Sequence, residues 1–152
     1  MKGNIYISDF GVSASLKKGQ KRKTFVGSPC WMAPEVMEQS GHDSSADIWS
    51  IGVTAIELAQ GKAPYSSLNA MKVILKILND PPPKLDDNDD FDFIFHEFIE
   101  DCVQKNASKR PSIEQIFKTH KKFFQKAKDA EYLKSYFLRE LKEISVRKNT
   151  QL

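Results

Sequence analysis

The sequence predicts a mainly α-helical fold with a minimal β element near the N-terminus. From residue 34 onward, apolar residues recur at the three- and four-residue spacing of a helix face. Capping residues begin these periodic stretches, and a glycine or a run of prolines ends them. Before residue 34, only the Ile-Tyr-Ile run at residues 5–7 is typical of a strand, and residues 12–30 form a long polar loop.

The first long helix is expected to extend from Ser44 to Leu58. Asp47 follows Ser44 at the spacing of a capping box, and Gly61 can end the helix in a left-handed conformation. Its apolar side chains cover most of the circumference, which is typical of a buried central helix. These side chains are Ile48, Trp49, Ile51, Val53, Ile56 and Leu58.

Two more helices are expected before residue 103. Ser67 can cap the first of them, and the three prolines at residues 81–83 end it. Asp89 and Asp90 favour the start of the second, because carboxylates cap a helix N-terminus and stabilise its dipole. The expected core residues are Leu68, Met71, Ile74, Leu75 and Leu78 in the first helix and Ile94, Phe95, Phe98, Ile99 and Cys102 in the second.

The C-terminal part of the chain has two further helical patterns. One helix begins at Ser112, with Gln115 as its capping partner. The other is a tail at residues 129–152, which we expect to be an amphipathic helix that packs on a partner surface. The apolar stripe of this tail is Leu133, Phe137, Leu141 and Ile144.

Composition and charge argue against several classes of protein. The 152 residues are 40% hydrophobic, which is enough for one domain with a core, and the net charge of +3 is too small to favour nucleic acid or a membrane surface. Cys30 and Cys102 lack metal-ligand spacing, and no leader or bilayer-spanning stretch is evident. We therefore expect a soluble, cytoplasmic protein in a reducing compartment, with no nucleic-acid or membrane partner.

A candidate metal-binding motif, Asp9-Phe10-Gly11, follows the predicted strand. A carboxylate at a strand end offers two anionic oxygens to a magnesium ion that bridges nucleotide phosphates. The alternative is an Asp-Gly turn between strands. The first interpretation is favoured because Ala33-Pro34-Glu35 and Arg110-Pro111 follow in the order of the downstream half of a protein-kinase signature.

Residues 25–37 read Phe-Val-Gly-Ser-Pro-Cys-Trp-Met-Ala-Pro-Glu-Val-Met and resemble the substrate-binding segment of sterile-20-like protein kinases. Within that group, residues 9–14, 23–27 and 123–128 most resemble the oxidative-stress-responsive and proline-alanine-rich kinases. The resemblance implies a partial protein kinase domain at residues 1–128, equivalent to the C-terminal lobe without the N-terminal lobe. Such a domain serves the transfer of the ATP γ-phosphoryl group to protein Ser or Thr, with ATP and magnesium as cofactors.

The resemblance also implies roles for individual residues. Asp9, Phe10 and Gly11 would bind the cofactor, with Asp9 as the metal ligand. Thr24 would be the activation-loop threonine that an upstream activating kinase phosphorylates. The implied substrate-binding loop is Gly27, Ser28, Pro29, Cys30 and Trp31, with Ser28 in place of the family's usual threonine.

Three charged residues have implied structural roles. Glu35 and Arg110 correspond to a buried ion pair that ties the activation segment to the helical lobe, the alternative being that each is an exposed charge. Asp47 corresponds to a residue that accepts hydrogen bonds from the backbone of the catalytic loop. In a chain without that loop, Asp47 would be either a simple helix N-terminal charge or a desolvated carboxylate without donors.

Several motifs that phosphoryl transfer needs are absent from the 152 residues. The seven glycines include no Gly-x-Gly pair, and no histidine is followed by Arg-Asp, so no residue is assigned as the catalytic base. We therefore expect this chain alone to be inactive as a kinase. The alternatives are a non-catalytic protein-binding module and a pseudokinase-like scaffold. A Gly-rich loop and a His-Arg-Asp motif encoded upstream of Met1 would identify the chain as part of a longer kinase.

Two surfaces are candidates for contacts with molecules other than protein substrates. Uncovered apolar area at residues 5–7 and 133–144 is expected to favour self-association. The other surface is a basic cluster, for which a solvated loop is the simplest interpretation, and pairing with an acidic partner or with phosphorylated Thr24 is the alternative. This cluster consists of Lys17, Lys18, Lys21, Arg22 and Lys23.

Overall fold

The computed structural model describes residues 4–11, 13, 15, 17, 20–22, 27–86 and 91–149, with the backbone alone at 142–149. The chain forms two units. One unit consists of Ser13–Phe124, and the other joins Met1–Val12 to Gln125–Leu152. The larger unit holds the hydrophobic core, so it is the unit in which a rigid site can be built.

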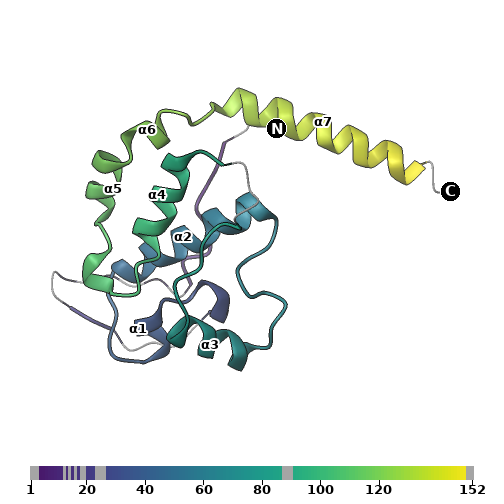
Figure 1. Ribbon diagram of the computed structural model, residues 1–152. Helices are drawn as coiled ribbons and strands as arrows, with labels where there is room; N and C mark the ends of the chain where they lie inside the picture. Colours follow the sequence, from purple (N-terminus) through teal and green to yellow (C-terminus); the bar gives the residue numbers. More distant parts are fainter. Residues whose placement is uncertain are drawn as a thin grey trace. The chain divides into compact units, whose positions relative to one another are not determined.

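The described part of the chain is mainly helical, as the sequence predicts. The prediction of a strand at residues 5–7 is wrong, because residues 4–10 form no strand. The side chains of Ile5, Tyr6 and Ile7 are about four-fifths exposed. A strand needs a neighbour to satisfy its backbone, and none pairs with this run among the residues described. The elements are η1 (Pro29–Trp31), α1 (Pro34–Met37), α2 (Ser45–Gln60), α3 (Ala70–Asn79), α4 (Phe93–Cys102), η2 (Ala107–Lys109), α5 (Ile113–Thr119), α6 (Lys121–Phe124) and α7 (Ala130–Asn149) (Figure 1).

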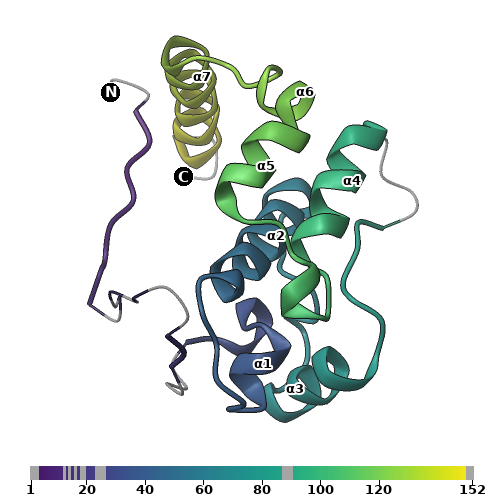
Figure 2. The ribbon, with the colours of Figure 1, turned by 90° about the vertical axis from the view of Figure 1, so that its left-hand side faces the viewer.

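Helix α2 is the central helix of the larger unit. Trp49, Val53 and Ile56 are completely buried, and both views of the ribbon show α4 alongside α2 (Figures 1 and 2). The helix ends at Gly61, whose φ of 73° is the left-handed conformation that the sequence predicts. It is not buried on every side, however, because the apolar side chains of Leu58 and Ile51 are 81% and 40% exposed.

The predicted capping box at the start of α2 is wrong. The Ser44 side chain makes no capping hydrogen bond. Instead, the Asp43 Oδ1 atom accepts a hydrogen bond of 2.9 Å from the Ser45 N–H. Hydrogen bonding by the Ser45 side chain, and then by this N–H group, lowers the pKa of Asp43. A carboxylate one residue earlier therefore satisfies the N-terminus, which is a role that Asp performs as well as Ser.

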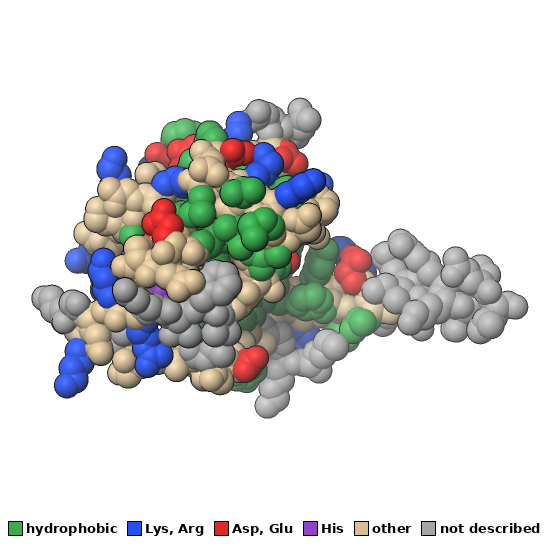
Figure 3. All heavy atoms as spheres, turned by 90° about the horizontal axis from the view of Figure 1, so that it is seen from below, with side chains coloured by type: hydrophobic (Ala, Val, Ile, Leu, Met, Phe, Trp, Pro, Cys, Tyr) green, Lys and Arg blue, Asp and Glu red, His purple; other side chains and the backbone are tan. Residues whose placement is uncertain are grey.

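Helix α3 buries the predicted face only in part, with Ile74 and Leu78 partly buried against the core. Val73 and Ile77 are buried, whereas Met71 and Leu75 are 65% and 52% exposed. The cap is Asn69, whose side chain accepts from the Lys72 N–H, and not Ser67. Seen from below, where α3 lies, hydrophobic side chains gather on the surface of the molecule (Figure 3).

Helix α4 packs with the face that the sequence predicts, since Phe98, Ile99 and Cys102 are buried. Its N-cap is Asp92, and the predicted starting residues Asp89 and Asp90 lie outside the described residues. Phe98 stacks on Phe123 of α6, with ring centroids 4.4 Å apart. These aromatic contacts hold the last short helices of the unit against α4.

Helix α5 begins with the predicted capping box. The Ser112 side chain accepts from the Gln115 N–H at 3.3 Å, and the Gln115 Oε1 atom accepts from the Ser112 N–H at 2.7 Å. Two N–H groups that the helix itself leaves unpaired are thereby satisfied.

We expect Ser112→Ala to lower the free energy of unfolding by about 1 kcal/mol, because it removes one side of this reciprocal cap. Urea denaturation followed by circular dichroism measures the change. Thr119→Ala is the matched control, since Thr119 lies at the other end of α5 and bonds only the Gln115 carbonyl among the contacts described. A Ser112→Ala variant as stable as this control would contradict the prediction.

The smaller unit contains the tail helix α7. Its apolar side chains are largely uncovered, with Tyr132, Phe137 and Leu141 about half exposed. The side chain of Ile144, the last residue of the predicted stripe, is outside the described part. Among the described residues, no helix combines the length and hydropathy needed to cross a bilayer.

Candidate functional site

Residues 27–37 of the larger unit, which we call the clamped segment, form a short irregular stretch followed by η1 and α1. Gly27 has a φ of 126°, which L side chains rarely adopt, and Pro29 starts η1. Cys30, Met32 and Ala33 are buried in the core, whereas Ser28 stays exposed. The predicted loop residues 27–31 therefore begin exposed and end with buried Cys30 and half-buried Trp31.

Helix α2 holds this segment by two hydrogen bonds to one residue. The Trp31 Nε1–H group donates to the Glu57 Oε2 atom at 3.0 Å, and the Ser50 hydroxyl donates to the Trp31 carbonyl at 2.9 Å. Sequence reasoning missed Ser50 and Glu57, because they lie 19 and 26 residues from Trp31 and no spacing rule connects them.

The structure brings Glu35 and Arg110 together. Their side chains form a two-pronged ion pair, with Nη1 to Oε1 at 2.7 Å and Nη2 to Oε2 at 2.9 Å. The Arg110 side chain is 0% exposed and that of Glu35 is 12% exposed. This planar pairing joins α1 to the end of η2, and two parallel charge-assisted bonds are the strongest form of such a pair.

Arg110 makes further contacts that complete its hydrogen bonding. Its guanidinium donates to the carbonyl groups of Ser45 and Gln104 at 2.9 and 2.8 Å. It also lies 5.2 Å from the centre of the Trp49 ring, within the range of a cation–π interaction. One buried side chain thus connects α1, the start of α2 and the loop after α4.

Asp47 lies on the rim of a hollow of about 540 Å³ beside this ion pair. It is exposed, which favours the alternative of a simple helix N-terminal charge over that of a desolvated carboxylate. The apolar floor of the hollow includes Ile48 and Ile51 of α2, and Ser112 and Ile113 contribute from the start of α5.

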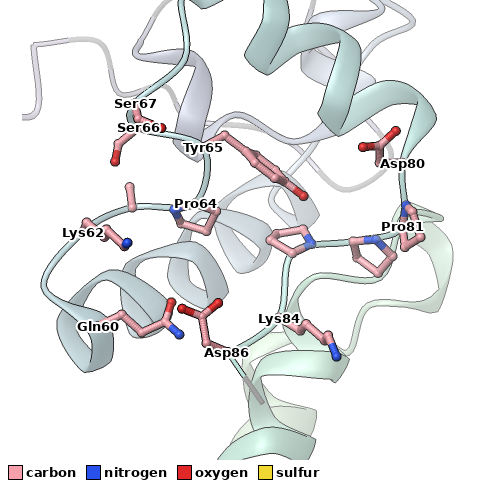
Figure 4. Close-up of a pocket in the computed structure, with 13 residues that line it drawn as sticks. Gln60, Lys62, Pro64, Tyr65, Ser66, Ser67, Asp80, Pro81, Lys84 and Asp86 are labelled. Atoms are coloured by element: carbon pink, nitrogen blue, oxygen red, sulfur yellow. The ribbon is translucent and has the colours of Figure 1, made fainter. Parts of the chain in front are cut away.

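A second hollow, of about 460 Å³, opens between the loop after α2 and the three prolines at residues 81–83 (Figure 4). Tyr65 lines it with a φ of 61°, and the Lys76 ammonium lies 5.7 Å from the centre of the Tyr65 ring. Lys62, Asp80 and Asp86 carry charges of both signs around the rim, so the hollow has no single electrostatic preference.

The residues of the candidate metal motif belong to the smaller unit. Asp9, Phe10 and Gly11 are exposed, and Asp9 has a φ of 61°. No group of three or more potential metal-ligating side chains occurs within the described ranges. Magnesium is often held by one or two carboxylates and by substrate phosphates, so an exposed Asp9 carboxylate fits as one ligand but cannot form a complete site. Thr24 lies outside the described residues, as do Lys18 and Lys23 of the basic cluster, whereas Lys17, Lys21 and Arg22 are described and exposed.

Both cysteines are free thiols with little nucleophilic character. Burial raises the pKa of Cys102 to about 12. Burial also raises the pKa of Cys30, and the nearby Glu57 carboxylate adds to this effect. Because the thiolate is the reactive form, neither side chain is a candidate for covalent catalysis.

The protein kinase domain family matches residues 1–124, which is most of the chain. The chain belongs to the protein kinase family. Relatives include the serine/threonine-protein kinase fray2 of Dictyostelium discoideum, 47% identical over 149 residues, and germinal center kinase 3 of Caenorhabditis elegans, 43% identical over 159 residues. Both matches cover 95% of this chain. Serine/threonine-protein kinase 1 of Arabidopsis thaliana is 39% identical over 127 residues, or 83% of this chain.

These relatives are serine/threonine kinases of the sterile-20-like group, as the sequence motifs predict. The chain spans only 14%, 26% and 15% of the lengths of these three kinases. Matches that cover 95% of the chain leave too few residues outside them to omit helix α7. Part of the tail after residue 128 is therefore included in the matches to fray2 and germinal center kinase 3, although the sequence motifs alone end at that point.

Proposed function

We propose that this chain forms the activation segment and helical lobe of a serine/threonine protein kinase that transfers the ATP γ-phosphoryl group to protein Ser or Thr. The ion pair between Glu35 and Arg110 carries the proposal. It anchors the C-terminal end of the clamped segment to the helical lobe, while Trp31 is held to α2. A segment fixed at both positions has the rigidity that a surface for aligning a substrate requires.

Within this proposal, residues 27–31 contact the protein substrate, Thr24 receives an activating phosphate from an upstream kinase, and Asp47 anchors the catalytic loop. Asp9 supplies one carboxylate to magnesium, which neutralises charge on the nucleotide phosphates when it is bound. We further propose that the nearest subfamily is that of the oxidative-stress-responsive and proline-alanine-rich kinases, with a cytoplasmic location. The boundary between the kinase domain and the tail stays at residue 128 in this proposal.

We expect the purified 152-residue chain to show no transfer of phosphate from ATP. Positioning by a phosphate-covering loop, a lysine and metal ions supplies most of the rate of this reaction, and a single aspartate does not replace them. Incubation with radiolabelled ATP, magnesium and myelin basic protein measures the activity. Incorporation above that of a boiled sample, and lost in the Asp9→Asn variant, would refute the expected inactivity.

A chimeric kinase tests the proposed function itself. Residues 4–124 replace the equivalent segment of germinal center kinase 3, which shares 43% identity with this chain. We expect the chimera to phosphorylate protein substrates, and we expect Asp9→Asn to reduce kcat by at least about a hundredfold because a metal ligand is lost. The control is Leu58→Ala, an exposed position on α2. A folded but inactive chimera would contradict the proposal.

A second candidate is a non-catalytic protein-binding module. The observation in its favour is that, among the residues described, the side chains of Trp31 and Glu35 are held by Glu57 of α2 and by Arg110, which both belong to this chain. Calorimetric titration of the 152-residue chain with a Ser/Thr peptide distinguishes the candidates. Tight binding to the chain alone favours the module, whereas binding that requires the chimera favours the kinase segment.

We also propose that uncovered apolar side chains of the smaller unit cause self-association. Ile5, Tyr6 and Ile7 are exposed, as are Tyr136 and Phe137 of α7. Exposed apolar area of this kind favours association. Sedimentation velocity should show species larger than the monomer at micromolar concentration, and a single monomeric boundary would argue against the proposal.

A further inference from the structure

Lys21 and Arg22 belong to the basic cluster, and the structure attaches this stretch of chain to the loop that precedes α2. The Arg22 N–H donates to the His42 carbonyl at 2.8 Å, and the His42 N–H donates to the Arg22 carbonyl at 2.8 Å. Two residues that exchange both hydrogen bonds in this way form one hydrogen-bonded pair of an antiparallel β ladder. The backbone at residue 22 is therefore fixed beside residue 42.

Further contacts order the chain just before this pair. The Gln20 N–H donates to the Lys17 carbonyl at 2.9 Å, and the Lys17 N–H donates to the Gln20 Oε1 atom at 3.2 Å. A Cβ atom placed on Gly41 would lie 3.4 Å from Lys21 Cβ, so the Lys21 side chain begins close to the loop before α2. The described members of the basic cluster therefore extend from an ordered backbone.

The positive charges of these side chains are not balanced within the described residues. Lys17, Lys21 and Arg22 are exposed, and no ion pair among the residues described includes any of them. Asp43 responds only weakly to Lys21, because hydrogen bonding by Ser45 is the main cause of its lowered pKa. The same bond from Ser45 engages the Asp43 carboxylate at the start of α2. An excess of positive charge is thus left to attract an anionic partner.

We propose that Lys21 and Arg22 form a docking site for an acidic segment of a protein partner. A carboxylate suits both side chains, since the guanidinium group binds it with two parallel hydrogen bonds and the ammonium group adds a point charge. A protein is favoured over nucleic acid because residues 17–23 contain no aromatic side chain on which a base could stack. This site lies beyond the proposed kinase function and does not depend on it.

Fluorescence anisotropy of the 152-residue chain with a fluorescein-labelled peptide of alternating Glu and Gly tests the site. Binding should weaken as salt is raised, because exposed charges are screened. Arg22→Ala should weaken binding about fivefold, the factor for an exposed pair with good geometry. Lys122→Ala removes an equal charge from an exposed position on α6 and should have less than about a twofold effect.

Two results of this titration would overturn the site. One is that the Glu peptide does not bind the parent chain. The other is that Arg22→Ala and Lys122→Ala weaken binding equally, because net charge and not a particular position would then account for it.

Two variants at residue 42 test whether the ordered backbone matters. His42→Pro removes the N–H donor to the Arg22 carbonyl without changing the charge of the cluster, and it should weaken binding about threefold, because the ordering must then be supplied on binding. His42→Ala is the matched control, since it also lacks the ring but keeps the N–H group, and it should bind like the parent chain. A folded His42→Pro variant that binds as tightly as His42→Ala would overturn the ordered site. If the melting curve shows that His42→Pro is unfolded, the comparison of Arg22→Ala with Lys122→Ala decides.

Other anions test the class of partner. A peptide with Gln in place of Glu should not bind, because it lacks the carboxylates. Single-stranded oligothymidylate, and vesicles of phosphatidylcholine and phosphatidylserine, should bind more weakly than the Glu peptide at an equal concentration of charge. Tighter binding of either one, with the same loss in Arg22→Ala, would overturn a protein partner in favour of nucleic acid or a membrane surface.

Discussion

Replacing Arg110 with alanine is expected to lower the free energy of unfolding by about 3–5 kcal/mol, because it leaves Glu35 as a poorly solvated charge without its partner. The Glu35 side chain is 12% exposed and accepts two hydrogen bonds from the Arg110 fork. The same substitution removes the donors to the carbonyl groups of Ser45 and Gln104. Thermal denaturation should show a melting temperature lower by roughly 6–20 °C for a chain of this size.

A double-mutant cycle separates the ion pair from the other contacts of Arg110. Glu35→Ala combined with Arg110→Ala should cost less than the sum of the single variants, because the double variant leaves no buried charge unpaired. Arg139→Ala is the matched control, since its side chain is 66% exposed and its ion pair with Glu140 is 3.8 Å long. That control should change stability by less than about 0.5 kcal/mol.

Total stability of a domain this size is about 5–15 kcal/mol, so Arg110→Ala can fail to fold. Arg110→Lys keeps the charge but loses the planar fork, and it should give an intermediate loss. If Arg110→Ala and Arg139→Ala had the same melting temperature, the ion pair between Glu35 and Arg110 would not be what holds the clamped segment.

Local patterns in the sequence were sufficient for some features of the fold and not for others. Gly61 and the pair of Ser112 and Gln115 are correct because caps depend on a few neighbouring residues. The predicted face of α3 is correct for Ile74 and Leu78 and wrong for Met71 and Leu75, because apolar residues occupy more than one side of this helix. The face that is buried depends on the packing of η1 and α1 against α3, which leaves Val73 and Ile77 buried and Met71 and Leu75 exposed.

For the candidate site, too, some features could be predicted from the sequence and others could not. The resemblance to kinases implies that Glu35 and Arg110 pair across 75 residues, and the structure places their side chains in contact. Neither the resemblance as stated nor any periodicity pointed to Glu57, since an acidic residue near the end of an exposed helix turn is usually solvated. Its partner is visible only when η1 and α2 are seen together. Contacts between distant segments are the part that single-sequence patterns do not contain.

The second large effect is expected for a substitution at Gly52. This residue lies in the middle of α2, where glycine weakens a helix. A Cβ atom added there would lie 2.7 Å from Cys102 Cβ and 2.7 Å from Val103 Cγ1. Both neighbours are buried, and Cys102 Cβ is attached directly to the backbone of α4, so neither can move away easily. The glycine is therefore what allows α2 and α4 to approach so closely.

Two opposing effects decide the result of Gly52→Ala. Alanine improves helix propensity by about 1 kcal/mol, whereas overpacking of a well-packed core costs about 1–3 kcal/mol. With two contacts shorter than real Cβ atoms show, the cost should be at the upper end, which gives a net loss of about 1–2 kcal/mol. Gly52→Val adds two further methyl groups at the same contact and should lose more.

The matched control is Thr54→Ala, which places alanine on the exposed side of the same helix. Alanine there should leave stability unchanged or raise it slightly, because propensity improves and no neighbour is displaced. Urea denaturation of the three variants gives the comparison. Equal stability of Gly52→Ala and Thr54→Ala would mean that α2 and α4 lie farther apart than in the structure. Trp49 lies one turn from Gly52, so a wider gap would also remove packing around the Trp49 ring, which contacts Arg110.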